Sequence, residues 1–319
     1  MDLKDKRIVL IGGAGLIGSH LCDLLVEEPV REVVVLDNFV RGRRENLARA
    51  SQSPKLTIIE QSMTDSDAVQ KALEGAHGVF LLASLWLGEC LDEPRAAWET
   101  NVLGSWNVVE ACQKLGVERL VYSSSASVYG DALVTPMTEQ HPFNNRNTYG
   151  ATKIACEQML RAIHDQHGLA YVGLRYMNVY GPRMDYRGAY VSVIMRVLDR
   201  IFAGQPPLIH GDGSQTYDFI YVEDAARANL LAMQAECSDV FLNVGSGQGT
   251  SLNELVARLL ELTGSPLEPQ YQPQTQSLVT QRVGSTELAE RLLGFRASTP
   301  LAEGLERVLA WRRVEELAS

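Results

Sequence analysis

A tyrosine and a lysine lie four residues apart in the segment TYGATK, as Tyr149 and Lys153. This spacing places both side chains on one face of a helix. A nearby ammonium group favours the phenolate and lowers the pKa of a tyrosine from its usual value of about 10. Such a tyrosine can take a proton from a reacting hydroxyl group or return one to it. Y-x-x-x-K also occurs by chance in many helices, so the pair gains weight only from its context.

Three serines, Ser123 to Ser125, end the segment ERLVYSSS. Its β-branched and aromatic residues predict a strand, and three adjacent hydroxyl groups are unusual in a strand interior. The serines are therefore candidates for contacting the group on which Tyr149 acts.

The segment GGAGLIG places Gly12, Gly15 and Gly18 at a G-x-x-G-x-x-G spacing between a predicted strand and a predicted helix. A backbone without side chains can approach a pyrophosphate, and the helix N-terminus supplies N–H donors. Asp37 ends the next strand about 20 residues further on, where a carboxylate accepts hydrogen bonds from an adenosine ribose. The pattern predicts a nicotinamide dinucleotide, whose ring would exchange hydride while Tyr149 moves a proton.

The form of that dinucleotide depends on charge. The carboxylate of Asp37 would repel a 2′-phosphate, which favours NAD. NADP stays the alternative, because three arginines beyond Asp37 could accommodate the phosphate: Arg41, Arg43 and Arg44.

Alternating strand and helix signals position these residues. Apolar runs predict strands at residues 7–13, 32–38, 55–60, 77–84, 118–125 and 170–176. Helical periodicity lies between most of them, at residues 16–28, 65–74, 94–115 and 149–167. This alternation predicts an α/β fold with a doubly wound parallel sheet covered on both faces.

The regular alternation of predicted strands and helices ends at about residue 175. Residues 178–190 and 204–219 are rich in Gly, Pro and polar residues and are expected to be loops. Helices are expected at 190–202, 222–234, 251–262 and 301–314, and a strand at 239–247. We therefore expect a dinucleotide-binding domain over residues 1–175, to which 218–245 returns, and a smaller substrate-binding lobe over 176–319.

Composition excludes several classes of partner. The net charge of −10 argues against nucleic acid, which needs a basic face. The longest apolar runs are shorter than a membrane helix, and the first residues do not resemble a signal peptide, so a cytoplasmic protein without a membrane contact is expected. The five cysteines show no C-x-x-C spacing, which indicates reduced structural thiols and no metal site.

Together these motifs resemble a known family. The glycine loop, Asp37, Asn101, SSSASVYG, the Tyr149–Lys153 pair and RYMNVYGPR are similar to the extended short-chain dehydrogenases, and within them to the nucleotide-sugar epimerases and dehydratases. The motifs are closest to those of the UDP-hexose 4-epimerases. The resemblance spans nearly the whole chain and implies a Rossmann domain with a C-terminal substrate lobe. It also implies a homodimer built from the helices over 94–115 and 149–167.

The resemblance carries functional roles over to single residues. Ser125, Tyr149 and Lys153 match the catalytic residues. The expected cofactor contacts are Gly12, Gly15, Leu16, Ile17, Gly18, Asp37, Asn38, Arg43, Ser62, Met63, Leu82, Ala83, Ser84, Asn101, Ser123, Tyr149, Lys153 and Met177. The expected substrate contacts are Ser125, Tyr149, Asn178, Arg183, Tyr217 and Arg282.

The residues after Ser125 narrow the reaction. In the family's 4,6-dehydratases an Asp–Glu pair follows the catalytic hydroxyl residue, and decarboxylases carry a Glu in the second position. Here the two residues are Ala126 and Ser127, which cannot act as a carboxylate acid or base. The resemblance therefore implies an NAD-dependent 4-epimerase acting on a UDP-hexose or UDP-hexuronic acid. The alternative is a dehydrogenase or reductase with net oxidation or reduction of a sugar or another carbonyl substrate.

Two positions depart from the family pattern. Tyr217 replaces the arginine that contacts the diphosphate in G-D-G-x-x-x-R-D, so one charge-assisted contact is missing. Either Arg183, Arg187 or Arg282 replaces it, or the substrate binds differently. For Arg282 itself, a side chain that faces solvent is the alternative. Ser62 stands where an aspartate near the adenine is usual, although Asp65 follows it.

Overall fold

The computed structural model describes residues 1–186, 191–273 and 279–317. Seven parallel strands form the main sheet in the order β10-β6-β5-β4-β1-β2-β3. Their bounds are Arg7–Ile11 (β1), Glu32–Asp37 (β2), Leu56–Glu60 (β3), Gly78–Leu81 (β4), Arg119–Ser125 (β5), Tyr171–Tyr176 (β6) and Val240–Val244 (β10). The order reverses between β1 and β4, and in open α/β sheets ligands bind beyond the carboxyl ends of the strands at such a point.

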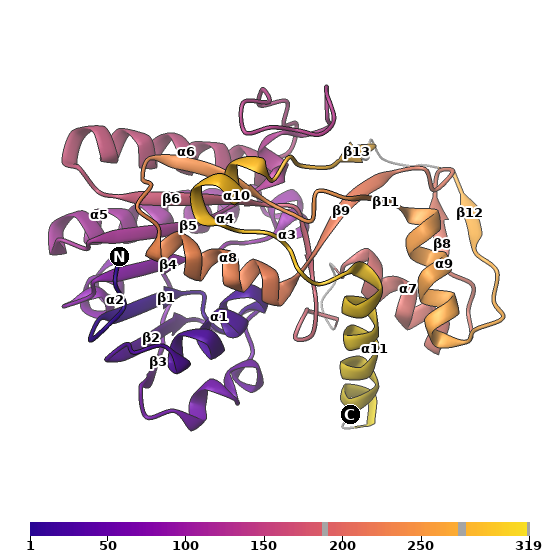
Figure 1. The fold of residues 1–319 in the computed structure, drawn as a ribbon, viewed down its shortest axis with the longest axis horizontal. Coiled ribbons are helices and arrows are strands. Elements are labelled where there is room, and N and C mark those ends of the chain that lie inside the picture. The colour runs from indigo at the N-terminus through magenta and orange to yellow at the C-terminus, as the bar shows by residue number, and fades with distance from the viewer. Residues whose placement is uncertain (187–190, 274–278, 318–319) are drawn as a thin grey trace.

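Helices cover both faces of this sheet, as Figure 1 shows. One face carries Leu16–Glu27 (α1), Val222–Gln234 (α8) and Glu287–Leu293 (α10). The other carries Ser66–Leu73 (α2), Ser105–Leu115 (α5) and Thr148–His167 (α6). Successive residues of a strand point to opposite faces, so Ile8 and Leu10 enter one core while Val9 and Ile11 enter the other. The predicted α/β fold with a doubly wound parallel sheet is confirmed.

Helix α6, which carries Tyr149, begins and ends at defined residues. Asn147 caps its start by accepting a hydrogen bond from the backbone N–H of Gly150 at 2.8 Å. Its end is set by Gly168, whose φ of +74° suits glycine. The cap fixes where the first turn begins and therefore where Tyr149 projects.

The smaller region contains two further sheets. The strands Asn178–Tyr180 (β7), Thr216–Tyr221 (β9), Gly249–Ser251 (β11) and Gln281–Arg282 (β13) form one, and Leu208–His210 (β8) pairs with Gln270–Gln272 (β12) in the other. Helices Val193–Phe202 (α7), Leu252–Thr263 (α9) and Leu301–Leu317 (α11) pack against them. In Figure 1 this region lies to the right of the main sheet.

Several predicted loops are wrong. Residues 178–190 contain β7, and 204–219 contain β8 and most of β9. These short strands form through parallel pairing between distant segments, such as Asn178 with Phe219, which local periodicity does not reveal. Helix α10 was also not predicted.

The expected helix over 94–115 consists of three successive segments. Pro94–Ala97 (α4) precedes a π-helical segment, Trp98–Gly104 (η3), and α5 follows. A shorter helix, Leu87–Asp92 (α3), precedes α4. The expected domain division stays a prediction, and the structure adds that β10 pairs with β6 in the main sheet.

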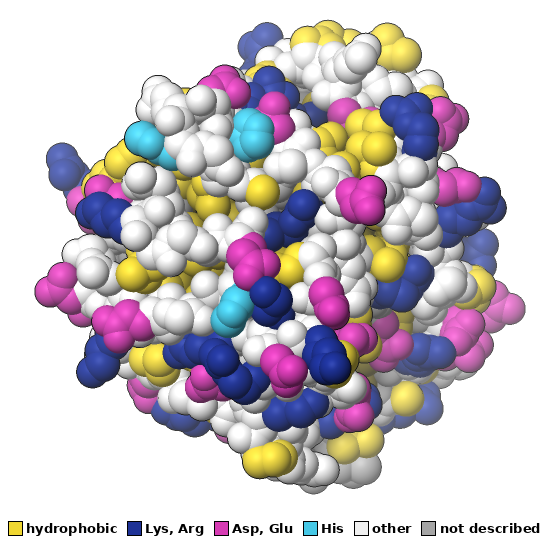
Figure 2. All heavy atoms as spheres, turned by 60° about the vertical axis from the view of Figure 1, so that its left-hand side comes forward, with side chains coloured by type: hydrophobic (Ala, Val, Ile, Leu, Met, Phe, Trp, Pro, Cys, Tyr) yellow, Lys and Arg dark blue, Asp and Glu magenta, His cyan; other side chains and the backbone are white. Residues whose placement is uncertain are grey.

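Figure 2 shows basic and acidic side chains interspersed over one face of the molecule, with hydrophobic side chains in several groups between them. Among the residues that the structure describes, none of the helices combines the length and the apolar character needed to cross a bilayer.

Candidate active site

Tyr149 and Lys153 lie in the first two turns of α6, and both are buried. The ammonium group of Lys153 donates a hydrogen bond to the carbonyl oxygen of Ser123 at 2.8 Å and lies 5.6 Å from the centroid of the Tyr149 ring. The ring packs against Cys90 and Ala97. The structure thus brings the predicted pair together beside the end of β5.

The three serines of β5 have different surroundings. Ser123 exchanges a hydrogen bond with the hydroxyl of Tyr176 at 3.2 Å, whereas Ser124 donates to Glu157 at 2.5 Å. The Ser125 hydroxyl accepts a hydrogen bond from the backbone N–H of Ser127 at 3.1 Å, and Ser125 is only partly buried. Of the three, Ser125 is therefore the hydroxyl that a ligand can reach most readily.

The glycine turn between β1 and α1 excludes side chains. Gly12 has a φ of +86°, and a Cβ there would lie 2.6 Å from the backbone nitrogen of Ala83. At Gly18 a Cβ would lie 2.5 Å from the carbonyl oxygen of Gly12. No side chain caps α1 at Gly15, so its first N–H groups, which include those of Leu16 and Ile17, are suited to an anion.

Asp37 ends β2 beside this turn and is buried. Its carboxylate accepts hydrogen bonds from the backbone N–H groups of Ala14 and Phe39, both at 2.9 Å. Burial raises the pKa of Asp37, although these two bonds oppose the shift. A carboxylate has about four acceptor positions, so capacity remains for ribose hydroxyl groups. The turn, the uncapped helix and Asp37 together fit a dinucleotide.

The arginines that follow Asp37 already face carboxylates. Arg41 pairs with Glu89 at 3.0 Å, and Arg43 pairs with Glu315 at 3.4 Å. Arg44 pairs with Glu60. Because these charges are compensated within the chain, a 2′-phosphate would gain less from them, which agrees with NAD as the cofactor.

The remaining expected cofactor contacts follow the strand ends. Leu82, Ala83 and Ser84 come directly after β4, and Met177 comes after β6. The side chain of Asn101 is buried in η3, where it accepts from the N–H of Leu85 at 2.7 Å and donates to Thr152 at 3.2 Å. Asn101 therefore joins the loop after β4 to α6.

The three remaining expected contacts follow β2 and β3 and differ in exposure. Asn38 is exposed and accepts a hydrogen bond from the N–H of Val40. Ser62 lies in a turn with Thr64, at 2.8 Å between the hydroxyl oxygens, and Met63 is buried. Asp65 caps α2, and its carboxylate accepts hydrogen bonds from the backbone N–H groups of Asp67 and Ala68.

The expected substrate contacts of the second region are only partly brought together. Arg282 pairs in register with Tyr217 across β13 and β9, and its charge acts on both Tyr217 and Tyr149. Burial lowers the pKa of Arg282, and its buried Nε has no hydrogen-bond partner among the described residues. The phenol of Tyr217 donates to the carbonyl oxygen of Val279 at 2.9 Å. Arg282 thus lies beside Tyr217, within electrostatic range of Asp131 and Tyr149.

Two other substrate candidates have partners within the chain. The amide of Asn178 donates to the carbonyl oxygen of Asp218 at 3.2 Å. Arg183 forms an ion pair with Asp23 on α1 at 2.7 Å, which occupies one arm of its guanidinium group. Arg187 lies outside the described residues.

A buried ion pair beside the serines was missed by the sequence analysis. Glu157 and Arg175 are 0% and 2% exposed and meet at 2.6 Å. Burial alone would lower the pKa of Arg175, but the hydrogen bonds and charge of Glu157 raise it. A signal was present, because an arginine inside the apolar strand YVGLRY requires a buried acceptor.

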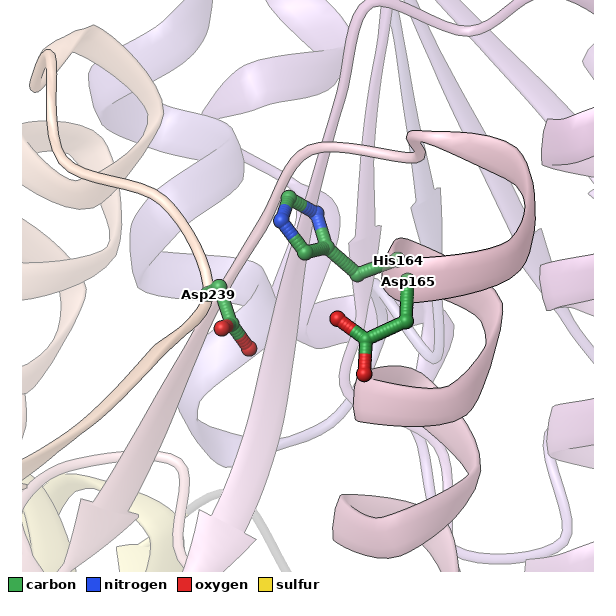
Figure 3. Close-up of side chains that lie close together, drawn as sticks. All are labelled: His164, Asp165 and Asp239. Carbon is green, nitrogen blue, oxygen red and sulfur yellow. The ribbon is translucent and has the colours of Figure 1, made fainter.

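A group of metal-type ligands lies at the opposite edge of the sheet. One ligand atom each from His164, Asp165 and Asp239 lies within 4.8 Å of the others, with two of these residues on the last turn of α6 and the third just before β10 (Figure 3). Asp239 accepts a hydrogen bond from the Tyr171 hydroxyl, and exposed acidic groups of this kind are common without a metal. The group is remote from the carboxyl ends of the strands and adds nothing to this site.

The chain matches the family model described as "NAD dependent epimerase/dehydratase family" over residues 8–245. A UDP-glucose 4-epimerase from Mycolicibacterium smegmatis is 32% identical over 96% of this chain and 98% of its own length. Two solved structures are similar in fold. A UDP-glucose 4-epimerase from Thermotoga maritima with UDP-glucose has a TM-score of 0.91 at 34% identity, covering 97% of this chain and 99% of its own. A UDP-N-acetylglucosamine 4-epimerase from Methanobrevibacter ruminantium, in complex with UDP-N-acetylmuramic acid, has a TM-score of 0.93 at 32% identity, covering 98% and 99%.

Proteins with other activities are similar at somewhat lower identity. A UDP-glucuronic acid decarboxylase from Arabidopsis thaliana is 28% identical over 95% of this chain and 87% of its own length. A dTDP-glucose 4,6-dehydratase from Streptomyces venezuelae with NAD bound has a TM-score of 0.91 at 26% identity, covering 98% of each chain. The family match and these full-length similarities agree with the site geometry: the chain belongs to the NAD-dependent epimerase/dehydratase family, and its cofactor is NAD.

Proposed function

We propose that this enzyme is a 4-epimerase of a nucleotide sugar. The observation that carries the proposal is the pair of residues after Ser125. Ala126 is buried, and Ser127 is buried with its N–H bonded to the Ser125 hydroxyl. Neither can supply the carboxylate that an elimination or a decarboxylation uses in the related enzymes. What remains beside β5 is a hydroxyl, a phenol and an ammonium group, which suffice for reversible oxidation of a carbinol.

Each residue has a separate role in this mechanism. Ser125 holds the C4 hydroxyl of the sugar by a hydrogen bond, and the Tyr149 phenolate takes its proton. Lys153, fixed to the carbonyl oxygen of Ser123, stabilises the phenolate by its charge. Bound NAD supplies the acceptor and donor of hydride. Epimerisation requires the 4-ketosugar to rotate between the two transfers, so that hydride would return to the other face of C4 while Tyr149 returns the proton to the C4 oxygen.

We propose that Arg282 binds the diphosphate of the substrate or a carboxylate of its sugar. Its buried Nε has no hydrogen-bond partner among the described residues, which supports this role. The carboxylate of Asp131, which acts on its charge, accepts hydrogen bonds from the backbone N–H groups of Thr280 and Gln281. The similar structures with UDP-glucose and with UDP-N-acetylmuramic acid favour a uridine nucleotide. A UDP-hexose or a UDP-hexuronic acid is therefore the proposed substrate.

A panel of UDP-, GDP- and dTDP-sugars tests the proposal, with product epimers resolved by chromatography. We expect one UDP-sugar to be interconverted with its C4 epimer without added NAD, because an epimerase retains its cofactor through the cycle. Net oxidation or reduction of a substrate at the expense of free NAD(P)(H) would instead establish the dehydrogenase alternative.

The Tyr149→Phe variant tests the assigned base. Loss of the phenolic hydroxyl removes proton transfer, so kcat is expected to fall by about 10²–10⁴-fold. The amount of copurified NAD should be unchanged, since the ring itself stays in place. A variant that keeps wild-type kcat contradicts the mechanism.

A further inference from the structure

The middle serine of β5 belongs to a buried network that the mechanism does not use. Ser124 donates to Oε1 of Glu157 at 2.5 Å. Arg175 on β6 binds the same carboxylate through Nε at 2.9 Å to Oε1 and through a terminal nitrogen at 2.6 Å to Oε2. Both carboxylate oxygens of Glu157 therefore have partners. The Glu157–Arg175 pair is bidentate, which fixes the orientation of the two side chains relative to each other.

The network extends from this ion pair to the second region. The other terminal nitrogen of Arg175, Nη1, donates to the Tyr129 hydroxyl at 2.8 Å, and this hydroxyl donates to the side-chain oxygen of Asn243 on β10 at 2.7 Å. The amide of Asn243 in turn donates to the carbonyl oxygens of Met137 and Ser285. Ser285 follows β13 by three residues, so the network connects α6, β5, β6 and β10 with the segment that carries Arg282.

The position of the network relative to the proposed catalytic groups is specific. Glu157 lies one helical turn beyond Lys153 and two turns beyond Tyr149 on α6. Ser124 lies between Ser123, whose carbonyl accepts the Lys153 hydrogen bond, and Ser125. The side chain of Ser124 meets α6 on one face of the sheet, while Ser123 contacts Tyr176 and through it α8 on the other. The Ser124–Glu157 bond therefore joins the strand that bears one catalytic group directly to the helix that bears the other two.

Net stability alone does not explain such an arrangement. A buried ion pair loses hydration, and apolar residues of similar volume often stabilise a fold equally well or better. A fixed hydrogen-bond geometry, in contrast, specifies how far α6 can slide or rotate over β5. A displacement of about 1 Å between reacting groups can lower a rate by about a hundredfold.

We propose that Ser124, Glu157 and Arg175 are positioning residues that hold Tyr149 at its working distance from Ser125 by locking α6 onto β5. The proposal rests on the catalytic roles assigned above to Ser125, Tyr149 and Lys153. The proposal is that these three positioning residues affect the chemical step and not the binding of the nucleotide sugar or of NAD.

Ser124→Ala is the decisive variant, because it removes one hydrogen bond and leaves the Glu157–Arg175 pair intact. Glu157→Gln would leave the buried guanidinium of Arg175 without its charged partner and is expected to impair folding, so it serves as a second variant only. Ser298→Ala is the matched control. The Ser298 hydroxyl also donates to an arginine-paired carboxylate, that of Asp224 on α8, at 2.8 Å, but away from the site.

Turnover of UDP-glucose by the NAD-loaded enzyme gives the first measurement. Ser124→Ala should lower kcat by about tenfold or more while KM stays within about twofold. Ser298→Ala should retain the wild-type kcat. A Ser124→Ala variant with unchanged kcat, or an equal loss in Ser298→Ala, overturns the proposal.

The NAD content of the purified proteins gives a second measurement that does not require turnover. It should be the same in the wild type, Ser124→Ala and Ser298→Ala, because the proposal assigns the three residues to the chemical step. If no sugar is epimerised by the wild type, the proposed function fails, whereas loss of NAD from Ser124→Ala in parallel with its loss of kcat overturns the positioning role.

Discussion

The hydroxyl groups around Tyr149 show how single residues divide the work of the site. Ser123 and Ser124 are buried and have side-chain partners on opposite faces of the sheet, whereas Ser125 bonds only to a neighbouring N–H among the described residues. Alternation along the strand explains why Ser123 and Ser124 point to opposite faces of the sheet. Ser125 differs from Ser123 because it is the last residue of β5 and is only partly buried.

A single histidine gives the chain a pH-dependent stability. His20 on α1 is 8% exposed, and its Nε2 lies 3.1 Å from the carbonyl oxygen of Pro182. Burial, and then the charges of Arg183 and Arg49, lower its pKa from 6.5 to about 4. Since the unfolded chain binds the proton more readily, the folded state loses stability as the pH falls from about 6.5 to about 4.

Replacing this histidine should remove that dependence. The wild type is expected to lose up to about 3 kcal/mol of unfolding free energy over this range through His20, and His20→Gln should not show this part of the loss. Denaturant unfolding at a fixed NAD concentration across the range measures it. His167→Gln, at an exposed histidine, is the control. Parallel curves for the wild type and His20→Gln would contradict the assignment.

Among the elements, the loops after β2, β4 and β7 are joined by one side chain. The Arg41 guanidinium donates to Glu89 on α3 at 3.0 Å and to Asp185 at 3.2 Å, and it lies 5.0 Å from the centroid of the Trp86 ring. The first two loops adjoin expected cofactor contacts, Asp37 at the end of β2 and Ser84 in the loop after β4. Arg41 therefore links three loops, two of which carry expected cofactor contacts.

The Arg41→Ala variant should release NAD faster. These contacts are half-exposed, so the loss is expected to be modest, about 1 kcal/mol or roughly a fivefold higher dissociation rate. Stopped-flow exchange of bound NAD measures the rate. Arg44→Ala, which removes an exposed ion pair with Glu60 from the same loop, should leave it unchanged. An equal effect of both variants would indicate a general electrostatic contribution to NAD binding and not a specific role of the Arg41 contacts between the loops.

Elements also show what the sequence could and could not predict. The strands of the main sheet were predictable because each is a continuous apolar run, such as EVVVLD, bounded by turn residues. Strands β7 and β9 were not, since their pairing depends on segments about 40 residues apart. In the site, Gly12, Asp37 and Tyr149 follow from local spacing. The Ser124–Glu157–Arg175 network does not, because the three residues meet only when α6 lies across β5 and β6.

At the level of the whole molecule, one surface carries exposed apolar residues on neighbouring helices. Trp98 and Leu103 of η3 and Trp106 of α5 are 44%, 59% and 40% exposed, and both elements pack beside α6. A depression of about 400 Å³ adjoins them, lined by Leu91, Trp98 and the start of α6. Exposed apolar groups of this size mark interaction sites. We propose that this surface joins two copies of the chain, as the family resemblance implies.

Association through this surface would also support catalysis, because η3 and α5 pack beside α6, which carries Tyr149 and Lys153. Light scattering at micromolar concentration should give the mass of a dimer. The double variant Leu103→Glu, Trp106→Glu should give a monomer, since burying two unpaired carboxylates per protomer costs several kcal/mol. Leu133→Glu, at a 63% exposed leucine away from these helices, should leave the dimer intact. A wild-type monomer would contradict the proposal. If the monomeric variant is folded but has a lower kcat, the interface contributes to the position of α6, as the buried Glu157–Arg175 pair is proposed to do.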